Sequence, residues 1–328
     1  MFSRAAFRQT DRTDAALSRQ RLIRAASRLP YPLVHRLLQG AIRAETWLRY
    51  PLWLLNTGDA IDETFDELDP DGQRFGLTQM VRRRYRKNFF YNEIADLVTL
   101  LMYVDDPRFR ERALYLENDE ALRSELKAGP GAIVAGFRLG TYAGMPWVLG
   151  AFGVPILMIV GDQEFARMAR ELGRAFAPDS AKPLTFIRAK DPLVLARSQA
   201  ALNDGGIVST LVDLSPIEYE KTTEVRLLDA NLQVAYGLPY LSAVTGRSII
   251  PAALTRASGP RFKLRFGEPL AAPARDSASV RAVTQDLYAA LERMIRRFPD
   301  QWIGWQTLRA ASSDKGEHAP QDVTLSLT

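Results

Sequence analysis

The chain has 328 residues, of which 47% are hydrophobic and 25% charged, and it carries a net charge of +5. These proportions are those of a folded globular protein and exclude a disordered chain or a fibrous repeat. Since the chain has no cysteine, it has no disulfide, no thiolate nucleophile, no cysteine-ligated zinc and no iron–sulfur cluster. His35 and His318 are its two histidines and lie far apart in sequence. We therefore expect no metal site and no cofactor, and any chemistry must use carboxylates, hydroxyls, arginines or backbone groups.

The first 58 residues are basic, with ten arginines and only three acidic residues. Residues 15–27 have apolar positions at roughly helical spacing, and residues 33–55 form a basic amphipathic segment that contains Trp47 and Trp53. A basic amphipathic helix with tryptophans suits an anionic membrane surface. We therefore expect a cytoplasmic protein, held peripherally on the inner face of the cell membrane. The alternative is a helix hairpin packed on the main domain, and the two roles can coexist.

An uncharged stretch covers residues 139–161 and is nominally long enough to span a bilayer. It contains two prolines and five glycines. The stretch divides into the end of a buried strand, a loop with a short helix over 140–152, and a second buried strand over 154–160. We therefore expect no membrane span here.

From residue 129 onward, short apolar strands alternate with amphipathic helices. Before that point, residues 56–73 are acidic and rich in turn-forming residues, whereas residues 77–102 and 108–127 have helical periodicity. Strands are expected over 132–137, 155–160, 184–187, 207–212, 225–228, 248–253 and 262–266, and helices over 162–176, 192–203, 234–245 and 279–298. This alternation is typical of an α/β layered domain with a central mixed sheet.

The chain is expected to divide into three parts. Residues 1–60 form a basic segment of N-terminal amphipathic helices, residues 61–310 form the α/β domain, and residues 311–328 form a polar, disordered tail. The sequence does not indicate an oligomeric state.

Short motifs that would identify a nucleotide-binding or hydrolytic site are absent. The Gly-Pro-Gly at 129–131 precedes a strand instead of following one, so it predicts a turn and not a dinucleotide-binding loop. The arginines are not interleaved with aromatic residues that could stack on bases, and we expect no binding of nucleic acid.

Four segments resemble parts of one enzyme family. Residues 291–305, LERMIRRFPDQWIGW, fit a helix LExxIRxxPxQW followed by an aromatic residue. Residues 205–213 are similar to a strand that ends in Asp, 235–251 to a helix–Thr–Gly–strand–Pro unit, and 131–144 to a strand with an active-site turn. Over about residues 75–310, the order and spacing of these segments resemble the bacterial lipid A biosynthesis late acyltransferases, within the lysophospholipid acyltransferase-like superfamily.

The resemblance implies transfer of an acyl chain from acyl carrier protein or acyl-CoA to a hydroxyl of a lipid acceptor. The family's active-site turn carries an HxxxxE motif, in which His removes the acceptor proton and Glu orients the His. Here Arg138 stands at the His position and Ala143 at the Glu position. An arginine cannot act as a base near neutral pH. His35 in the N-terminal segment and His318 in the tail are not expected to replace it.

The resemblance and the strand ends single out five residues: Arg138 and Asp213 as catalytic candidates, and Arg174, Gly140 and Tyr142 as substrate-binding candidates. Arg138 could bind an anion or a developing oxyanion, or it could form a structural salt bridge with Asp213 or Glu164. Arg174 could contact a substrate phosphate or be a surface arginine. Asp213 could orient such an arginine or cap a turn.

Two functions remain open at this point. The first is an acyltransferase with non-standard chemistry, acting on an amine or on a substrate that supplies its own base. The second is an inactive relative that binds acyl carrier protein, acyl chains or anionic lipid as a scaffold or regulator. An open pocket lined by Arg138 and Arg174 would favour the first function, and a site filled by side chains would favour the second. Acyl length and acceptor are not indicated.

Overall fold

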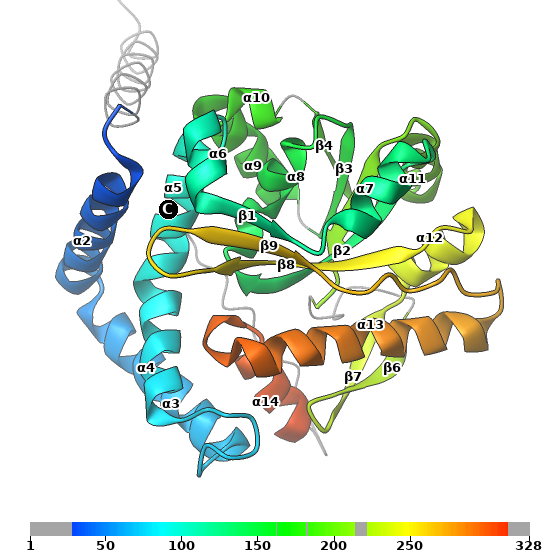
Figure 1. The fold of residues 1–328 in the computed structure, drawn as a ribbon. Helices are drawn as coiled ribbons and strands as arrows, with labels where there is room; N and C mark the ends of the chain where they lie inside the picture. Colours follow the sequence, from blue (N-terminus) through cyan, green and yellow to red (C-terminus); the bar gives the residue numbers. More distant parts are fainter. Residues whose placement is uncertain (1–27, 162, 182, 214–221, 314–328) are drawn as a thin grey trace, which may run out of the picture.

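The protein is described by a computed structural model over residues 28–161, 163–181, 183–213 and 222–313. A seven-stranded mixed sheet lies at its centre, as expected, with helices on both faces (Figure 1). The strand order is β1-β9-β8-β2-β5-β3-β4, in which only β8 and β9 pair antiparallel, and β6 and β7 form a separate antiparallel hairpin. The strands are β1 (Leu114–Glu117), β2 (Ala132–Gly140), β3 (Ile156–Val160), β4 (Leu184–Arg188), β5 (Ile207–Leu211), β6 (Thr222–Leu227), β7 (Ala230–Ala235), β8 (Ile249–Arg256) and β9 (Phe262–Phe266).

The two faces of the sheet are covered by different sets of helices. Helices α2, α5, α6, α7 and α8 pack on one face, while α3, α11, α12, α13, α14 and the β6–β7 hairpin pack on the other. The helices are α2 (Tyr31–Arg49), α3 (Pro51–Leu68), α4 (Gln79–Lys87), the π-helix η1 (Asn88–Asn92), α5 (Glu93–Tyr103), α6 (Pro107–Ala113), α7 (Glu120–Lys127), the 3-10 helix η2 (Tyr142–Gly144), α8 (Met145–Gly150), α9 (Gln163–Phe176), α10 (Pro178–Ala181), α11 (Val194–Asn203), α12 (Gly237–Thr245), α13 (Ser277–Arg297), the 3-10 helix η3 (Pro299–Gln301) and α14 (Trp305–Ser313).

Strand β2 is buried on both sides. Ile133, Ala135 and Phe137 belong to one hydrophobic cluster, and Ala132 and Val134 belong to the other. Because successive side chains of a strand point to opposite faces, this alternation places β2 in the middle of the layers. The carboxyl end of β2 therefore lies in the interior of the protein.

The acidic segment 56–73, predicted to be turn-rich, is helical through the end of α3. Ile61, Phe65 and Leu68 recur at helical spacing and are buried in the main core. Helix α3 also packs against α4 and α14. A division at residue 60 therefore falls inside a helix that belongs to the α/β body.

All seven predicted strands are present, but two predicted helices give way in part to additional strands. The helix expected over 108–127 is interrupted by β1, because that segment pairs with β9 and forms the edge of the sheet. The helix expected over 234–245 begins only at Gly237, because the preceding residues pair with β6. Leu228 and Asp229, which connect these two strands, both have positive φ, as a tight hairpin turn requires.

The uncharged stretch 139–161 contains the end of β2, then η2, α8 and β3, as predicted. Among the helices of the described residues, none combines the length and the apolar composition that crossing a membrane requires. The predicted helix over 15–27 and the predicted tail from 314 onward lie outside the described residues, whereas residues 311–313 belong to α14.

Candidate active site

The carboxyl end of β2 is irregular. The pairing of β2 with β8 shifts its register between Gly136 and Gly140, and Arg138 lies within this stretch. The backbone N–H of Arg138 donates to both carboxylate oxygens of Asp213, at 3.0 and 3.1 Å. Bulges of this kind commonly redirect side chains beside functional sites.

Arg138 and Asp213 also form an ion pair. The Nη2 of Arg138 donates to the backbone oxygen of Asp213, and its Nε lies 3.7 Å from Oδ1. Trp302 Nε1 donates to Oδ2 of the same carboxylate at 3.0 Å, and the Asp213 side chain is only 2% exposed. The structure therefore contains the salt bridge that was predicted between Arg138 and Asp213. The side chain of Glu164, the other predicted partner, lies outside the described residues.

Gly140 lets the turn after β2 lie directly against β8. Its φ is +66°, and a Cβ at this position would meet the backbone oxygen of Leu254 at 2.5 Å and Cα of Thr255 at 2.8 Å. Only glycine adopts this conformation readily and leaves this space. The next residue, Thr141, donates its N–H to the Leu254 oxygen at 2.8 Å, which fixes the turn.

Beyond the turn, Tyr142 hydrogen-bonds Glu93, the first residue of α5, which the sequence analysis did not single out. Burial raises the pKa of the Glu93 carboxyl to about 7; the hydrogen bond from Tyr142 and the charges of Arg256 and Arg138 lower it, whereas the charge of Asp96 raises it. Burial also raises the pKa of Tyr142. Near neutral pH, Glu93 can therefore take up or release a proton, while Tyr142 keeps its own.

The π-helix η1 determines where Glu93 points. The N–H of Glu93 donates to the oxygen of Asn88, five residues earlier. In an α-helix, residues five apart lie about 140° apart around the axis, whereas a π turn brings them to nearly the same side. Asn88 and Glu93 consequently line the same pocket. The sequence predicted one continuous helix over 77–102 and therefore missed this arrangement.

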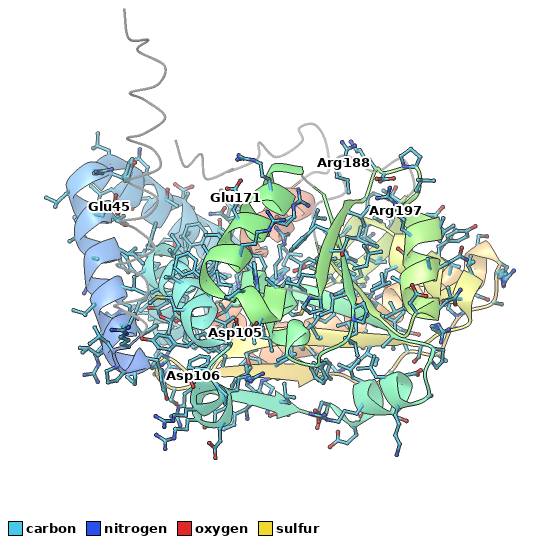
Figure 2. The ribbon with its side chains drawn as sticks, turned by 90° about the horizontal axis from the view of Figure 1, so that it is seen from above. Glu45, Asp105, Asp106, Glu171, Arg188 and Arg197 are labelled. Atoms are coloured by element: carbon cyan, nitrogen blue, oxygen red, sulfur yellow. The ribbon has the colours of Figure 1, made fainter. Side chains whose placement is uncertain are left out.

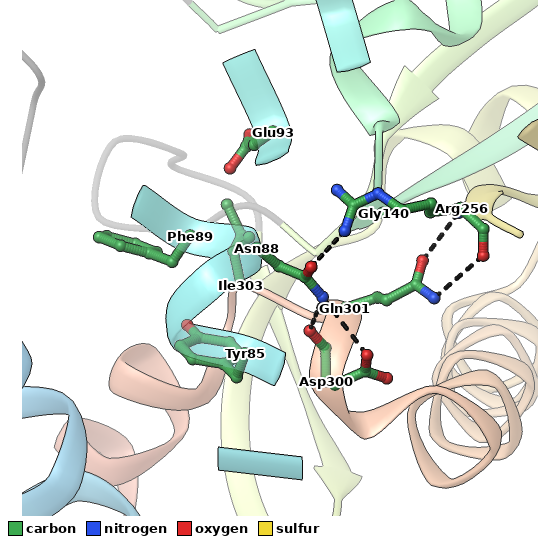
Figure 3. A pocket seen from close by; sticks show the side chains of 9 residues that line it. All are labelled: Tyr85, Asn88, Phe89, Glu93, Gly140, Arg256, Asp300, Gln301 and Ile303. Carbon is green, nitrogen blue, oxygen red and sulfur yellow. Dashed lines mark hydrogen bonds between the residues drawn. The ribbon is translucent and has the colours of Figure 1, made fainter. Parts of the chain in front are cut away.

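A small pocket lies between η1 and the turn after β2 (Figure 3). It has room for little more than a water molecule. In Figure 3, Glu93 and Tyr85 lie on one side of the pocket, with Arg256 on the opposite side. Within the described residues, the buried hydroxyl of Tyr85 has no hydrogen-bond partner. The lining residues are Tyr85, Asn88, Phe89, Glu93, Gly140, Arg256, Asp300, Gln301 and Ile303.

Arg256, at the end of β8, connects this pocket to a buried polar network. Its guanidinium binds the carboxylate of Asp96 and the side-chain oxygen of Asn88. Asp96 Oδ1 lies 2.7 Å from Nε2 of His35, and Thr141 Oγ1 contacts Oδ2 at 3.5 Å. His35 therefore lies close to the site, because α2 packs against α5. Buried and bound to Asp96, His35 supports the site but does not line the pocket.

The structure thus brings together four of the five predicted site residues, and these are Arg138, Gly140, Tyr142 and Asp213. Arg174 is exposed in the last turn of α9 and does not line the pocket. Little in the sequence points to Glu93 or Arg256. Glu93 follows a run of aromatic and amide residues, and Arg256 ends an apolar strand.

Within the part of the chain that the structure describes, no three His, Asp or Glu residues are grouped as a metal-binding site. The sequence matches no protein-family model, and it has no significant match among curated proteins.

Proposed function

We propose that this chain transfers an acyl group from acyl carrier protein or acyl-CoA to an acceptor at the turn after β2. The proposal is supported by one observation: segments that are far apart in the sequence, and that each resemble the late acyltransferases, contact one another at the end of β2. Arg138, Asp213 and Trp302 come from three of the four segments that resemble the late acyltransferases, and hydrogen bonds join them. The fourth segment includes the start of β8, which pairs with β2.

The proposed chemistry differs from that of the resembling family, because Arg138 and Ala143 replace its His and Glu. Arg138 is committed to Asp213 through Nη2, while its buried Nε has no hydrogen-bond partner within the described residues. A guanidinium held in this way keeps a positive charge beside the turn. Fixed positive charge stabilises the oxyanion that forms when a thioester is attacked.

One observation favours the second function, an inactive relative that binds acyl carrier protein, acyl chains or anionic lipid. The pocket at the turn is small and is lined by neither Arg138 nor Arg174. A site filled by its own side chains suits binding or scaffolding better than turnover. We place this function second, because Glu93 and Tyr85 present titratable groups to the pocket.

Attachment to an anionic membrane surface is part of the proposal. Helix α2 lies along one edge of the molecule (Figure 2). It exposes Leu37, Trp47 and Leu48, and the start of α3 exposes Leu52, with exposed fractions of 83% for Leu48 and 74% for Leu52. Leu37 and Leu48 are eleven residues apart, about three helical turns, and so lie on the same face of α2. We propose that this face, with Leu52 at the start of α3, enters the interface of the inner leaflet. We accordingly propose that the chain acts at the cytoplasmic face of the cell membrane.

Transfer can be tested directly by mass spectrometry. The full chain is incubated with a long-chain acyl–acyl carrier protein and vesicles that contain phosphatidylglycerol and phosphatidylethanolamine. One headgroup offers hydroxyls and the other an amine. We expect a lipid to gain the mass of the acyl chain as the carrier protein loses it. Loss from the carrier without gain by either lipid, or no change in either, overturns the proposal, and binding of the carrier without transfer supports the second function.

A further inference from the structure

We propose that Glu93 is the proton acceptor of this site and that the group it serves is a hydroxyl. The inference rests on the proposed acyl transfer. It adds a base from α5, an element outside the four resembling segments, and it names the class of acceptor.

The geometry around Glu93 supports this role. Its side chain is partly exposed and lines the pocket, and its carboxyl is held by a hydrogen bond from Tyr142. The pocket admits little more than a water molecule, so a hydroxyl can enter it while the body of the acceptor and the acyl chain stay outside. Glu93 would then lie within hydrogen-bond reach of the hydroxyl, which is the first requirement of a general base.

Tyr85 gives a second and independent sign of a ligand. Its side chain is 2% exposed, and its hydroxyl lines the pocket without a hydrogen-bond partner in the described residues. Buried hydroxyls nearly always find a partner. Burial raises the pKa of Tyr85, so this hydroxyl stays protonated and can donate to an incoming oxygen.

Burial, together with the charged groups around Glu93, sets the pH range in which its carboxyl titrates. With a pKa of about 7, the carboxyl is partly ionised near neutral pH and is a far better proton acceptor than an ordinary glutamate. The titratable and charged groups that face Glu93 are Tyr85 on α4, Asp96 on α5, Arg138 on β2, Tyr142 on η2, Arg256 on β8 and Asp300 on η3.

The step balances without a further reactant. The oxygen of the acceptor hydroxyl bonds to the thioester carbonyl carbon while its proton passes to a carboxylate oxygen of Glu93. The carbon–sulfur bond then breaks, and the thiol of the carrier leaves with the proton that Glu93 returns. Glu93 ends the cycle ionised, as it began, and the acceptor ends as an ester.

The decisive experiment compares a hydroxyl with an amine acceptor. Vesicles with phosphatidylglycerol or with phosphatidylethanolamine are offered to the wild type and to Glu93→Gln at mildly alkaline pH, where part of the amine is neutral. We expect Glu93→Gln to lower transfer to phosphatidylglycerol by about 100-fold to 10,000-fold, the usual effect of a general base. Transfer to the amine needs less help and should fall by less than about 10-fold.

Two control variants separate a role in proton transfer from damage to the fold. Glu111→Gln replaces an exposed carboxyl on α6, away from the pocket, and should keep wild-type rates on both lipids. Glu93→Asp should recover part of the transfer to phosphatidylglycerol, because it restores a carboxylate. An equal loss on both lipids, or full activity of Glu93→Gln, overturns the inference and leaves acyl transfer standing. A wild type that is inactive on both lipids overturns the proposed function itself.

The pH dependence of the transfer rate tests proton transfer by Glu93, because a purely structural role of Glu93 would not change its midpoint. Transfer to phosphatidylglycerol should rise with pH through a midpoint near 7, as Glu93 ionises. The hydrogen bond from Tyr142 lowers the pKa of Glu93, so Tyr142→Phe should shift that midpoint to higher pH. A midpoint that stays in place after this substitution contradicts the role of Glu93.

Discussion

Arg138 and Asp213 are joined through both backbone and side chains, since Arg138 gives its N–H to the carboxylate and its Nη2 to the Asp213 backbone oxygen. β2 and β5 are parallel neighbours, so this pair connects the carboxyl ends of two central strands. The carboxylate is almost fully buried. The pair therefore stabilises the fold at the place where we propose that chemistry occurs.

Arg138→Ala should destabilise the protein by about 3–5 kcal/mol, because it leaves the Asp213 carboxylate buried without its cation. The free energy of unfolding in urea measures this loss. Arg226→Ala, which removes an exposed ion pair with Asp229, is the matched control and should cost less than about 1 kcal/mol. A similar, small loss in both variants would show that the buried pair contributes little.

Glu93→Gln should stabilise the protein at alkaline pH. The pKa of Glu93 in the folded chain is about 7, above its ordinary value of 4.5, so its ionisation opposes folding. The wild type thus loses stability as pH rises from about 4.5 to about 7, by about 3 kcal/mol in total. Urea unfolding should give nearly equal stability for both proteins at about pH 4 and a more stable variant at about pH 8. A constant difference across this range would contradict the raised pKa.

Gly140→Ala should be more harmful than the same change at another glycine with positive φ. Gly259 has a φ of +68° with nothing near an added Cβ, whereas a Cβ at Gly140 would meet backbone atoms within 3 Å. We expect Gly259→Ala to cost about 1–2 kcal/mol from backbone strain alone, and Gly140→Ala to cost a further 1–3 kcal/mol, roughly, from overpacking. Thermal unfolding measures both, and equal losses would mean that β2 and β8 can separate without cost.

Leu48→Glu should weaken sedimentation with anionic vesicles, because Leu48 is the most exposed apolar residue of α2. Leu193→Glu, at an exposed leucine ahead of α11, is the matched control and should bind as the wild type does. High salt should also weaken binding, since each basic residue near an anionic surface contributes about 1 kcal/mol that salt screens. Equal binding to neutral and anionic vesicles would exclude an electrostatic contribution to membrane binding.

The strands were predictable because they depend on local composition. Each is a short apolar run bounded by glycine, proline or polar residues, a pattern that predicts buried strands. Arg138 and Asp213 could be expected to meet because each stands at the carboxyl end of such a run. The edge strand β1 was missed, because its pairing with β9 is decided by a segment far along the chain.

Glu93 could not be predicted as a site residue, because nothing local marks it. Its direction depends on a π turn, and its raised pKa depends on burial among β2, β8 and α4. The position of His35 beside the site could not be predicted for a similar reason. Its sequence position in a basic amphipathic segment gave no sign that Asp96 would bind it from α5.

The contact of Trp302 with Asp213, together with the bridge between Trp302 and Leu139, sets when the site is completed during synthesis. The chain leaves the ribosome from its N-terminus, so α5, β2 and β5 emerge well before the residues that follow α13. Until Trp302 arrives, Asp213 lacks one of its donors and β2 lacks its C-terminal bridge. A nascent chain therefore carries the pocket in unfinished form, and only release of the last helices completes its lining with Asp300, Gln301 and Ile303.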